Sequence, residues 1–239
     1  MLDYYHFTHR GGRNHNEDAV ACQVNGDNGV FVVCDGLGGH QRGEVASAAV
    51  RDVFIQNCLP GMRYNAQWML SSFDQANQHL MTIQNEQRCM MKSTAVVLAL
   101  NEKRACWANS GDSRLYYIHN HEICAYTEDH SVAYKKYKSG EITRNQLRTD
   151  EDQSALLKAL GNPERWEPDI TEWPYPVEAG DAFLLCSDGI WEYLQDDEIA
   201  IDLLKSDNAK EWAGLLLLRI IERVEPGHDN LTLLTLRIE

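Results

Sequence analysis

The chain has 239 residues and a formal net charge of −14, with 36 acidic residues against 22 basic ones. This balance argues against nucleic acid as a main partner, because phosphate backbones are bound by basic surfaces. Hydrophobic residues make up 44% of the chain, which is enough for a sizeable core, and no apolar run is long enough for a membrane helix. The start of the chain lacks the basic and apolar regions of a signal peptide, so we expect a cytoplasmic protein without membrane contact. The seven cysteines form no CxxC pair, which favours buried, reduced thiols over a zinc site or disulfides.

The first part of the chain combines short strands with two long helices. We expect strands over 1–9, 19–24 and 30–34, the last two joined by a hairpin turn. Apolar residues then recur at three- and four-residue spacing over 43–58 and 66–88, which predicts two amphipathic helices that cover a core.

The middle of the chain changes to the period of strands. Four short runs, 93–100, 104–109, 114–119 and 122–126, are separated by polar turns and predict an antiparallel meander. The following segment, 129–152, is polar and charged, and its lysines Lys135, Lys136 and Lys138 lie close together. We interpret it as a surface flap, although a disordered insertion fits the composition equally well.

The last part returns to mixed elements. Order resumes over 155–161, strands are expected over 166–173, 182–186 and 231–238, and helices over 190–194, 196–204 and 209–224. The last helix is apolar almost all round, which predicts that it is well buried. Together the elements predict an α+β fold in a single domain over 1–239, with two packed antiparallel sheets flanked by helices on both sides.

Two of the expected strands deliver an Asp-Gly pair: Asp35-Gly36 follows residues 31–34, and Asp188-Gly189 follows residues 182–186. A lone carboxylate beside a core strand costs several kcal/mol unless something pairs with it. Either pair alone most often marks a turn. Three further acidic elements share the same context at the ends of expected strands, namely Glu17-Asp18, Asp112 and Asp229-Asn230. Their number predicts that they converge on one rim.

Carboxylates gathered in this way repel one another unless cations lie among them. A site rich in carboxylates, with few His and no Cys ligands, favours Mg²⁺ or Mn²⁺. Two such ions would activate a water molecule and hold a phosphoryl group. Arg13 precedes Glu17 by four residues, and its guanidinium is suited to binding two phosphate oxygens, although an ordinary surface arginine is the alternative.

These elements belong to an ordered set of motifs: Arg13-x-x-Asn16-Glu17-Asp18, Asp35-Gly36-x-Gly38-Gly39-His40, Ser93-Thr94-Ala95, Gly111-Asp112-Ser113-Arg114, Asp129-His130-Ser131, Ala159-Leu160-Gly161, Ser187-Asp188-Gly189 and Asp229-Asn230. From about residue 9 to 238 the chain resembles the metal-dependent protein Ser/Thr phosphatase family (PPM, type 2C) in its compact bacterial form. The resemblance implies an αββα sandwich, with a metal site at one end between the sheets and a variable flap at about 131–155.

The resemblance also implies a role for each site residue. Asp35 would bridge two central metal ions, Gly36 would offer its carbonyl to one of them, and Asp188 and Asp229 would complete the other. Glu17 and Asp18 would hold metal-bound waters or ligate directly, and Asp112 would share a third, weaker ion with Asp188. Arg13 would bind the substrate phosphate.

The implied activity is hydrolysis of phosphoserine and phosphothreonine in proteins by a water or hydroxide that bridges two Mn²⁺ or Mg²⁺ ions. The implied partners are phosphoproteins and a bacterial Ser/Thr kinase system, and we expect a monomer. Plant and animal members usually carry a His directly after the Asp-Gly pair, whereas this chain has Leu37. We favour a metal-bound water over the nearby His40 as the general acid.

Two other functions compete with this interpretation. A catalytically dead binding module on the same fold would be expected to lack metal carboxylates, yet every matching position is filled here. A metal-dependent nuclease is disfavoured by the net charge.

Overall fold

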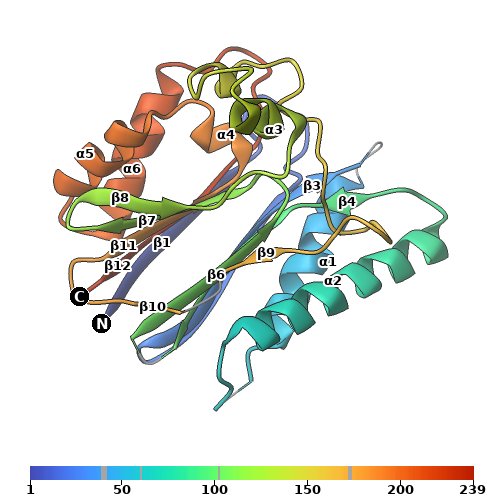
Figure 1. Cartoon of the computed structure of the whole chain (residues 1–239), viewed down its shortest axis with the longest axis horizontal. Helices are drawn as coiled ribbons and strands as arrows, with labels where there is room; N and C mark the ends of the chain where they lie inside the picture. Colours follow the sequence, from blue (N-terminus) through green and yellow to red (C-terminus); the bar gives the residue numbers. More distant parts are fainter. Residues whose placement is uncertain (39–41, 60, 102, 172–173) are drawn as a thin grey trace.

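The computed structural model describes residues 1–38, 42–59, 61–101, 103–171 and 174–239. In this part of the chain the strands form two antiparallel sheets that pack face to face, and helices cover the outer face of each sheet (Figure 1). The predicted αββα sandwich is thereby confirmed. Within the described residues, no helix has both the length and the apolar character needed to cross a membrane.

The first sheet has the strand order β1-β12-β11-β7-β8. Its strands are β1 (Leu2–His9), β7 (Arg114–His119), β8 (Glu122–Tyr126), β11 (Ala182–Cys186) and β12 (Leu231–Ile238). The helices on its outer face are α4 (Asp188–Trp191), α5 (Asp196–Leu204) and α6 (Ala209–Ile221).

The second sheet has the strand order β10-β6-β5-β3-β2, with β4 paired to β3 and β9 paired to β6. Its strands are β2 (Asp18–Asn25), β3 (Asn28–Leu37), β4 (Lys92–Ser93), β5 (Ala95–Asn101), β6 (Arg104–Ser110), β9 (Asp169–Ile170) and β10 (Tyr175–Pro176). Helices α1 (Gly43–Gln56) and α2 (Ala66–Gln87) cover it on the outside (Figure 1).

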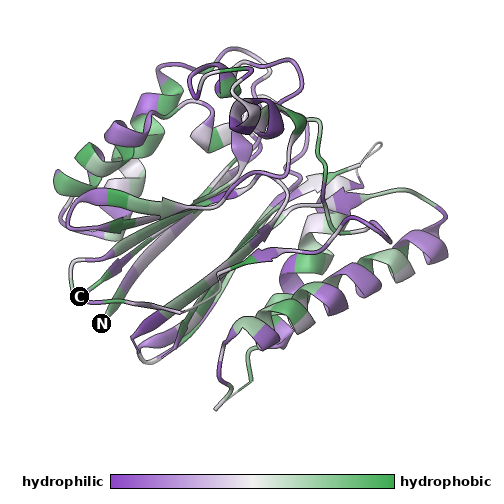
Figure 2. Ribbon diagram, viewed as in Figure 1, coloured by the Kyte–Doolittle hydropathy of each residue, from purple (hydrophilic) through white to green (hydrophobic). Residues whose placement is uncertain are grey.

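Strand β3 shows how the side-chain period of two builds the layers. Phe31 and Val33 point between the two sheets, whereas Val32 and Cys34 pack against the α1 and α2 layer. Helix α2 carries hydrophobic residues on one side and hydrophilic ones on the other, as Figure 2 shows. Both faces of β3 are therefore buried, and a carboxylate on this strand enters a dry environment.

The predicted meander is wrong, because the four strands belong to two sheets. Strands β5 and β6 pair in one sheet, and β7 and β8 pair in the other. The connection 111–113 crosses from one sheet to the other, and Gly111 adopts a left-handed conformation there with φ of 109°. Sequence periodicity reports strands and turns, but it does not report which sheet a strand joins.

Two strand boundaries near the Asp-Gly pair also differ from the prediction. Strand β3 continues to Leu37, so Asp35 and Gly36 lie inside it rather than after it. It continues because β4 pairs with its end, Gly36 opposite Ser93. The expected strand 93–100 is interrupted at Thr94, which separates β4 from β5.

Three elements of the last part are shorter or less buried than expected. The expected strand 166–173 is reduced to β9, with residues 172–173 outside the described part, and the expected helix 190–194 is α4, which begins at Asp188 itself. Helix α6 is not buried all round, since Leu218 and Ile221 are 60% and 64% exposed. Only one side of this helix faces the sheet.

The flap is ordered, so the alternative of a disordered insertion is wrong. It contains α3 (Val132–Ser139) and the short 3₁₀ helix η1 (Gln146–Arg148). Ala133, Tyr134 and Leu147 form a small core of their own. Lys136 contacts Asp150 and Asp152 at 3.0 and 2.7 Å, so it ties the two halves of the flap together.

Candidate active site

The end of β3 and the start of α4 lie at one end of the sandwich (Figure 1). A cleft of about 440 Å³ opens there. Six of the predicted site residues line it: Arg13, Glu17, Asp35, Gly36, Asp188 and Asp229. Ser154 of the flap and Leu37 line it as well. Asp18 and Asp112, the other two, are buried beside it and raise the pKa of Asp35. Elements far apart in the sequence therefore bring the predicted residues together.

Asp35 is fixed by the strand on which it lies. Its backbone N–H donates to the Thr94 hydroxyl at 2.9 Å, and its carbonyl accepts from Thr94 N–H at 2.8 Å. On the other side, the register of β2 and β3 places Asp18 directly opposite Asp35. Two like charges in directly opposite positions destabilise a sheet. This pair therefore requires protons or a cation nearby.

Gly36 lies where β3 approaches the start of α1. A Cβ atom on Gly36 would lie 2.0 Å from the carbonyl oxygen of Gly43, so the approach requires glycine. Glu17 lies against the same contact: its carbonyl accepts from Gly36 N–H at 3.1 Å, and its carboxylate accepts from Gly43 N–H at 3.2 Å. The Glu17 side chain is thereby held beside Asp35 and Gly36.

Asp188 and Asp229 come from neighbouring turns of the other sheet. Asp188 is the first residue of α4, and its carboxylate accepts from Gly189 N–H at 2.7 Å. Asp229 accepts from Asn230 N–H at 2.8 Å and from the Arg13 guanidinium at 2.9 Å. The predicted phosphate-binding arginine thus contacts a predicted metal ligand.

Asn230 organises the loop that carries Arg13 and Glu17. Its side-chain oxygen accepts from Glu17 N–H at 2.7 Å, and its amide nitrogen donates to the carbonyls of Arg10 and His15 at 2.8 and 2.9 Å. In the sequence, Asn230 was noted only as the neighbour of Asp229 in a motif. The structure shows that it satisfies three backbone groups of one loop.

The carboxyl groups of the site strongly affect one another. Burial, then the charge of Asp188, then that of Asp18, raises the pKa of Asp35 well above its usual value. Burial raises the pKa of Asp18 to about 7, and Asp188 adds to this effect. Burial followed by the charge of Asp229 raises the pKa of Asp188 to about 6. Desolvated, mutually repelling carboxylates are the electrostatic pattern of a site that binds cations.

Asp112 is the most buried of the predicted ligands, with 4% of its surface exposed. Its Oδ1 atom has no hydrogen-bond partner among the described residues. Its carbonyl accepts from the Trp191 indole N–H at 2.9 Å, which holds the turn against α4. Burial followed by the charge of Asp188 raises the pKa of Asp112 well above its usual value. An unpaired, buried carboxylate oxygen fits a cation ligand.

Glu192 is a further carboxyl that the sequence did not single out. Burial and then the charges of Asp188 and Asp229 raise its pKa to about 8. It follows α4 directly, four residues after Asp188. The four-residue spacing from Asp188 could have pointed to Glu192 in the sequence, because residues i and i+4 of a helix share one face.

The oxygen donors fit Mg²⁺ or Mn²⁺, but not as a closed cage of side chains. Within the described residues, no three or more His, Cys, Asp or Glu side chains form a group ready to hold an ion. Mg²⁺ commonly keeps several waters and takes one or two carboxylates directly. The open cleft, the backbone carbonyl at Gly36 and the unpaired Asp112 oxygen suit such partial coordination.

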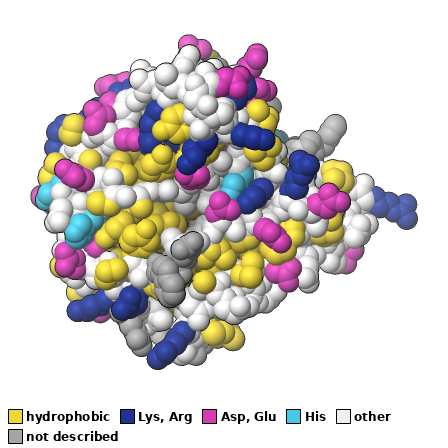
Figure 3. Space-filling model, in the orientation of Figure 1, with side chains coloured by type: hydrophobic (Ala, Val, Ile, Leu, Met, Phe, Trp, Pro, Cys, Tyr) yellow, Lys and Arg dark blue, Asp and Glu magenta, His cyan; other side chains and the backbone are white. Residues whose placement is uncertain are grey.

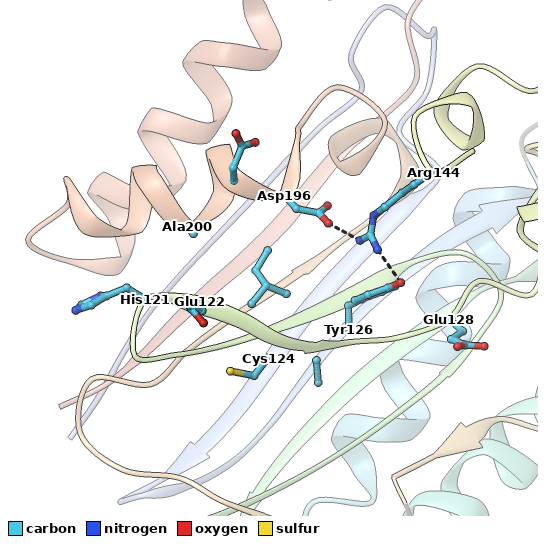
Figure 4. Close-up of a pocket in the computed structure, with 11 residues that line it drawn as sticks. His121, Glu122, Cys124, Tyr126, Glu128, Arg144, Asp196 and Ala200 are labelled. Carbon is cyan, nitrogen blue, oxygen red and sulfur yellow. Dashed lines mark hydrogen bonds and ion pairs between the residues drawn. The ribbon is translucent and has the colours of Figure 1, made fainter. Parts of the chain in front are cut away.

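A larger cavity, of about 560 Å³, lies between β8 and α5, away from these carboxylates (Figure 4). Arg144 of the flap reaches into it, donates to the Tyr126 hydroxyl at 2.8 Å and pairs with Asp196. Its guanidinium lies 4.4 Å from the centre of the Tyr126 ring. This arrangement attaches the flap to α5, and we assign the cavity no part in the chemistry.

His40 lies outside the described residues, so the preference for a metal-bound water over His40 as the general acid stays a prediction. Lys and Arg side chains are interspersed with Asp and Glu on the face that Figure 3 shows. Among the described residues, no continuous basic band is visible on that face.

The comparisons with known proteins place the chain in one family. The family model described as protein phosphatase 2C matches residues 8–209. The serine/threonine phosphatase stp of Listeria monocytogenes is 30% identical over 230 residues, which cover 93% of this chain and 90% of that protein. The crystal structure of the serine/threonine phosphatase Stp1 from Staphylococcus aureus aligns over 100% of this chain and 96% of its own, with 29% identity and a TM-score of 0.88.

A further solved structure contains metal. It is the catalytic domain of the serine/threonine protein phosphatase PstP in complex with two manganese ions, with 25% identity and a TM-score of 0.83 over 100% of this chain and 99% of that one. The fold, the carboxylate cleft and these matches define the protein as a phosphatase. The chain belongs to the protein phosphatase 2C family.

Proposed function

We propose that this protein serine/threonine phosphatase hydrolyses phosphoserine and phosphothreonine in other proteins with two Mn²⁺ or Mg²⁺ ions held in the carboxylate cleft. The observation that carries the metal proposal is the Asp18–Asp35 pair. Two carboxylates stand directly opposite each other on the paired strands β2 and β3, with raised pKa values and Asp188 close by. The manganese ions named in the PstP structure support the same assignment.

Each predicted ligand then takes the role that its position allows. Asp35 would lie between the two ions, with the Gly36 carbonyl on one side and Asp188 and Asp229 on the other. Glu17 and Asp18 would hold water molecules of the coordination shells or bind an ion directly. Asp112, whose Oδ1 is unpaired, would share a weaker third ion with Asp188.

When bound, the ions would lower the pKa of a water molecule so that it ionises near neutral pH, and they would offset the charge of the phosphoryl group. The side chains of the protein position the substrate phosphate. Arg13 is half exposed at the mouth of the cleft and can leave Asp229 for two oxygens of a phosphate dianion. Leu37 lines the cleft where plant and animal members usually carry a His, so we propose a water as the donor of the leaving-group proton.

Metal dependence is the direct test. We expect hydrolysis of p-nitrophenyl phosphate and of phosphoserine and phosphothreonine peptides with Mn²⁺ or Mg²⁺, and none in excess chelator. Asp35→Asn should remove nearly all turnover. The half-buried Asp74 on α2 offers a matched control, because Asp74→Asn changes the same charge away from the cleft. Full activity in excess chelator would contradict the proposal.

The physiological partners are a further part of the proposal. We propose that the substrates are phosphoproteins, which the names of the relatives support, and that a bacterial Ser/Thr kinase system phosphorylates them. Cytoplasmic location and a monomeric state stay predictions from the sequence. Phosphoproteomics of a deletion strain would identify the substrates.

A further inference from the structure

Thr94 occupies the break between β4 and β5 and is completely buried. The strand register on either side, Gly36 opposite Ser93 and Val33 opposite Val96, brings Thr94 beside Asp35. In an ordinary antiparallel pair the two residues exchange backbone hydrogen bonds. Here Asp35 N–H donates instead to the Thr94 hydroxyl at 2.9 Å. The side chain thus replaces the carbonyl in the ladder, which explains the break.

The same hydroxyl reaches a second segment. Thr94 Oγ1 lies 2.7 Å from Ser113 Oγ in a buried contact. Its methyl group packs on Gly111, because a Cβ atom on Gly111 would lie 2.5 Å from Thr94 Cγ2. A hydroxyl carries one proton and two lone pairs, so it can accept from Asp35 N–H and still donate to Ser113. Thr94 therefore contacts the residues on both sides of Asp112.

This double contact links the strand that carries Asp35 to the connection that carries Asp112. Asp35 lies on β3 of one sheet, whereas Asp112 lies in the connection 111–113 that leaves this sheet for the other. The connection could shift along the sheet if nothing fixed it there. We propose that Thr94 is a positioning residue that sets the separation of the Asp35 and Asp112 carboxylates. The inference rests on the proposed metal site and adds the residue that couples its central and outer ligands.

The prediction distinguishes the hydroxyl from the shape of the side chain. Thr94→Val keeps the shape and removes both hydrogen bonds, whereas Thr94→Ser keeps the hydroxyl. Loss of a hydrogen-bonding partner behind a ligand typically weakens metal affinity by about 10–100-fold. We expect Thr94→Val to raise the Kd of the weakest Mn²⁺ site by about tenfold and to lower kcat more than it raises KM. Thr94→Ser should remain within about twofold of wild type.

A matched control separates positioning from stability. Thr235 is also fully buried, and its hydroxyl donates to the Ala209 carbonyl at 2.8 Å on the far side of the other sheet. Thr235→Val should lower the stability to denaturant in a similar way and leave Mn²⁺ binding unchanged. Ser113→Ala removes the other partner of the Thr94 hydroxyl, and it should weaken the same metal site even if Thr94→Val does not fold.

The positioning role of Thr94 is tested by isothermal titration with Mn²⁺, denaturant unfolding and steady-state kinetics on the intact chain. Selective weakening in Thr94→Val or Ser113→Ala, with rescue in Thr94→Ser, supports the inference. Wild-type affinity in both variants, or equal weakening in Thr235→Val, overturns it. A wild-type protein that binds no Mn²⁺ overturns the proposed function as well, so the two failures are distinct.

Discussion

Asp35 shows the conflict between folding and function in a single residue. Burial and four neighbouring aspartates raise its pKa, so ionising it in the metal-free protein costs folding free energy. We predict that Asp35→Asn is more stable than wild type near neutral pH in chelator, because the amide removes the repelled charge. Thermal unfolding would show a rise in Tm of a few degrees, at about 2–4 °C per kcal/mol for a chain of this size. An equal or lower Tm would mean that Asp35 is stabilised by a contact that the asparagine loses.

The Arg13 guanidinium contacts the Asp229 carboxylate at 2.9 Å. A guanidinium can exchange this carboxylate for two parallel hydrogen bonds to a phosphoryl group, which an ammonium cannot match. We predict that Arg13→Ala raises KM and lowers kcat, with a combined loss on the order of 10²-fold, and that Arg13→Lys recovers only part of it.

Metal titration provides the control for Arg13. Because Arg13 competes with a cation for Asp229, its removal should leave Mn²⁺ affinity unchanged or slightly higher. If kcat/KM stays at the wild-type value in Arg13→Ala, the arginine serves only the ion pair at the surface, and Arg10 or a flap lysine becomes the candidate for the phosphate.

The chemistry-bearing residues could be read from the sequence more readily than their supports. Asp35 and Asp188 were visible because each follows an apolar strand and precedes glycine. Thr94 and Asn230 appeared in the sequence only as members of longer motifs, and Glu192 was not singled out. Their importance comes from contacts with residues far away in the chain, such as Asn230 with Glu17, and periodicity does not record such contacts.

At the scale of elements, the three lysines of the flap differ in whether they are paired with a carboxylate. Lys136 and Lys138 are paired with carboxylates of the flap and its base, Asp150, Asp152 and Glu128. Lys135 is exposed on α3. Of the three lysines, we therefore expect Lys135 to meet the substrate.

We predict that Lys135→Ala lowers kcat/KM on acidic phosphoprotein substrates and spares p-nitrophenyl phosphate, since a surface cation steers charged partners and not a small molecule. The effect should shrink at high salt. Lys205 on the far helical layer is a matched control, because it is also exposed and follows α5. Equal losses on both substrates would show that α3 supports the cleft instead.

The elements themselves were predictable where the local pattern decides them. Helices α1 and α2 end within two residues of their expected limits because their apolar stripes are long and regular. The assignment of β7 and β8 to the other sheet was not predictable, since it depends on the crossing at Gly111. The exposure of Leu218 on α6 was missed because apolar composition does not say how many sides of a helix are covered.

At the scale of the whole molecule, the acidic site couples folding to pH and to metal. The pKa values of Asp18 and Asp188 are raised from 3.8 to about 7 and about 6 in the folded protein. Between the unfolded and folded values the native state binds more protons than the unfolded state. The stability of the metal-free protein should therefore fall as pH rises through this window and level off above it.

We predict that the Tm of the metal-free protein falls by about 5–10 °C between about pH 5 and pH 7.5, at about 1.4 kcal/mol per unit of pKa shift and with a discount for the coupling of the groups. Mn²⁺ should reverse this trend. It binds ionised carboxylates, so protons compete with it at low pH, and its stabilisation grows with the ratio of free metal to Kd. Thermal unfolding with chelator and with Mn²⁺ across this pH range is the measurement. Asp74→Asn should keep both slopes, whereas Asp35→Asn should flatten them. A metal-free Tm that rises over the same range would show that the carboxylates are not forced together, and would remove the electrostatic argument for a metal centre in this cleft.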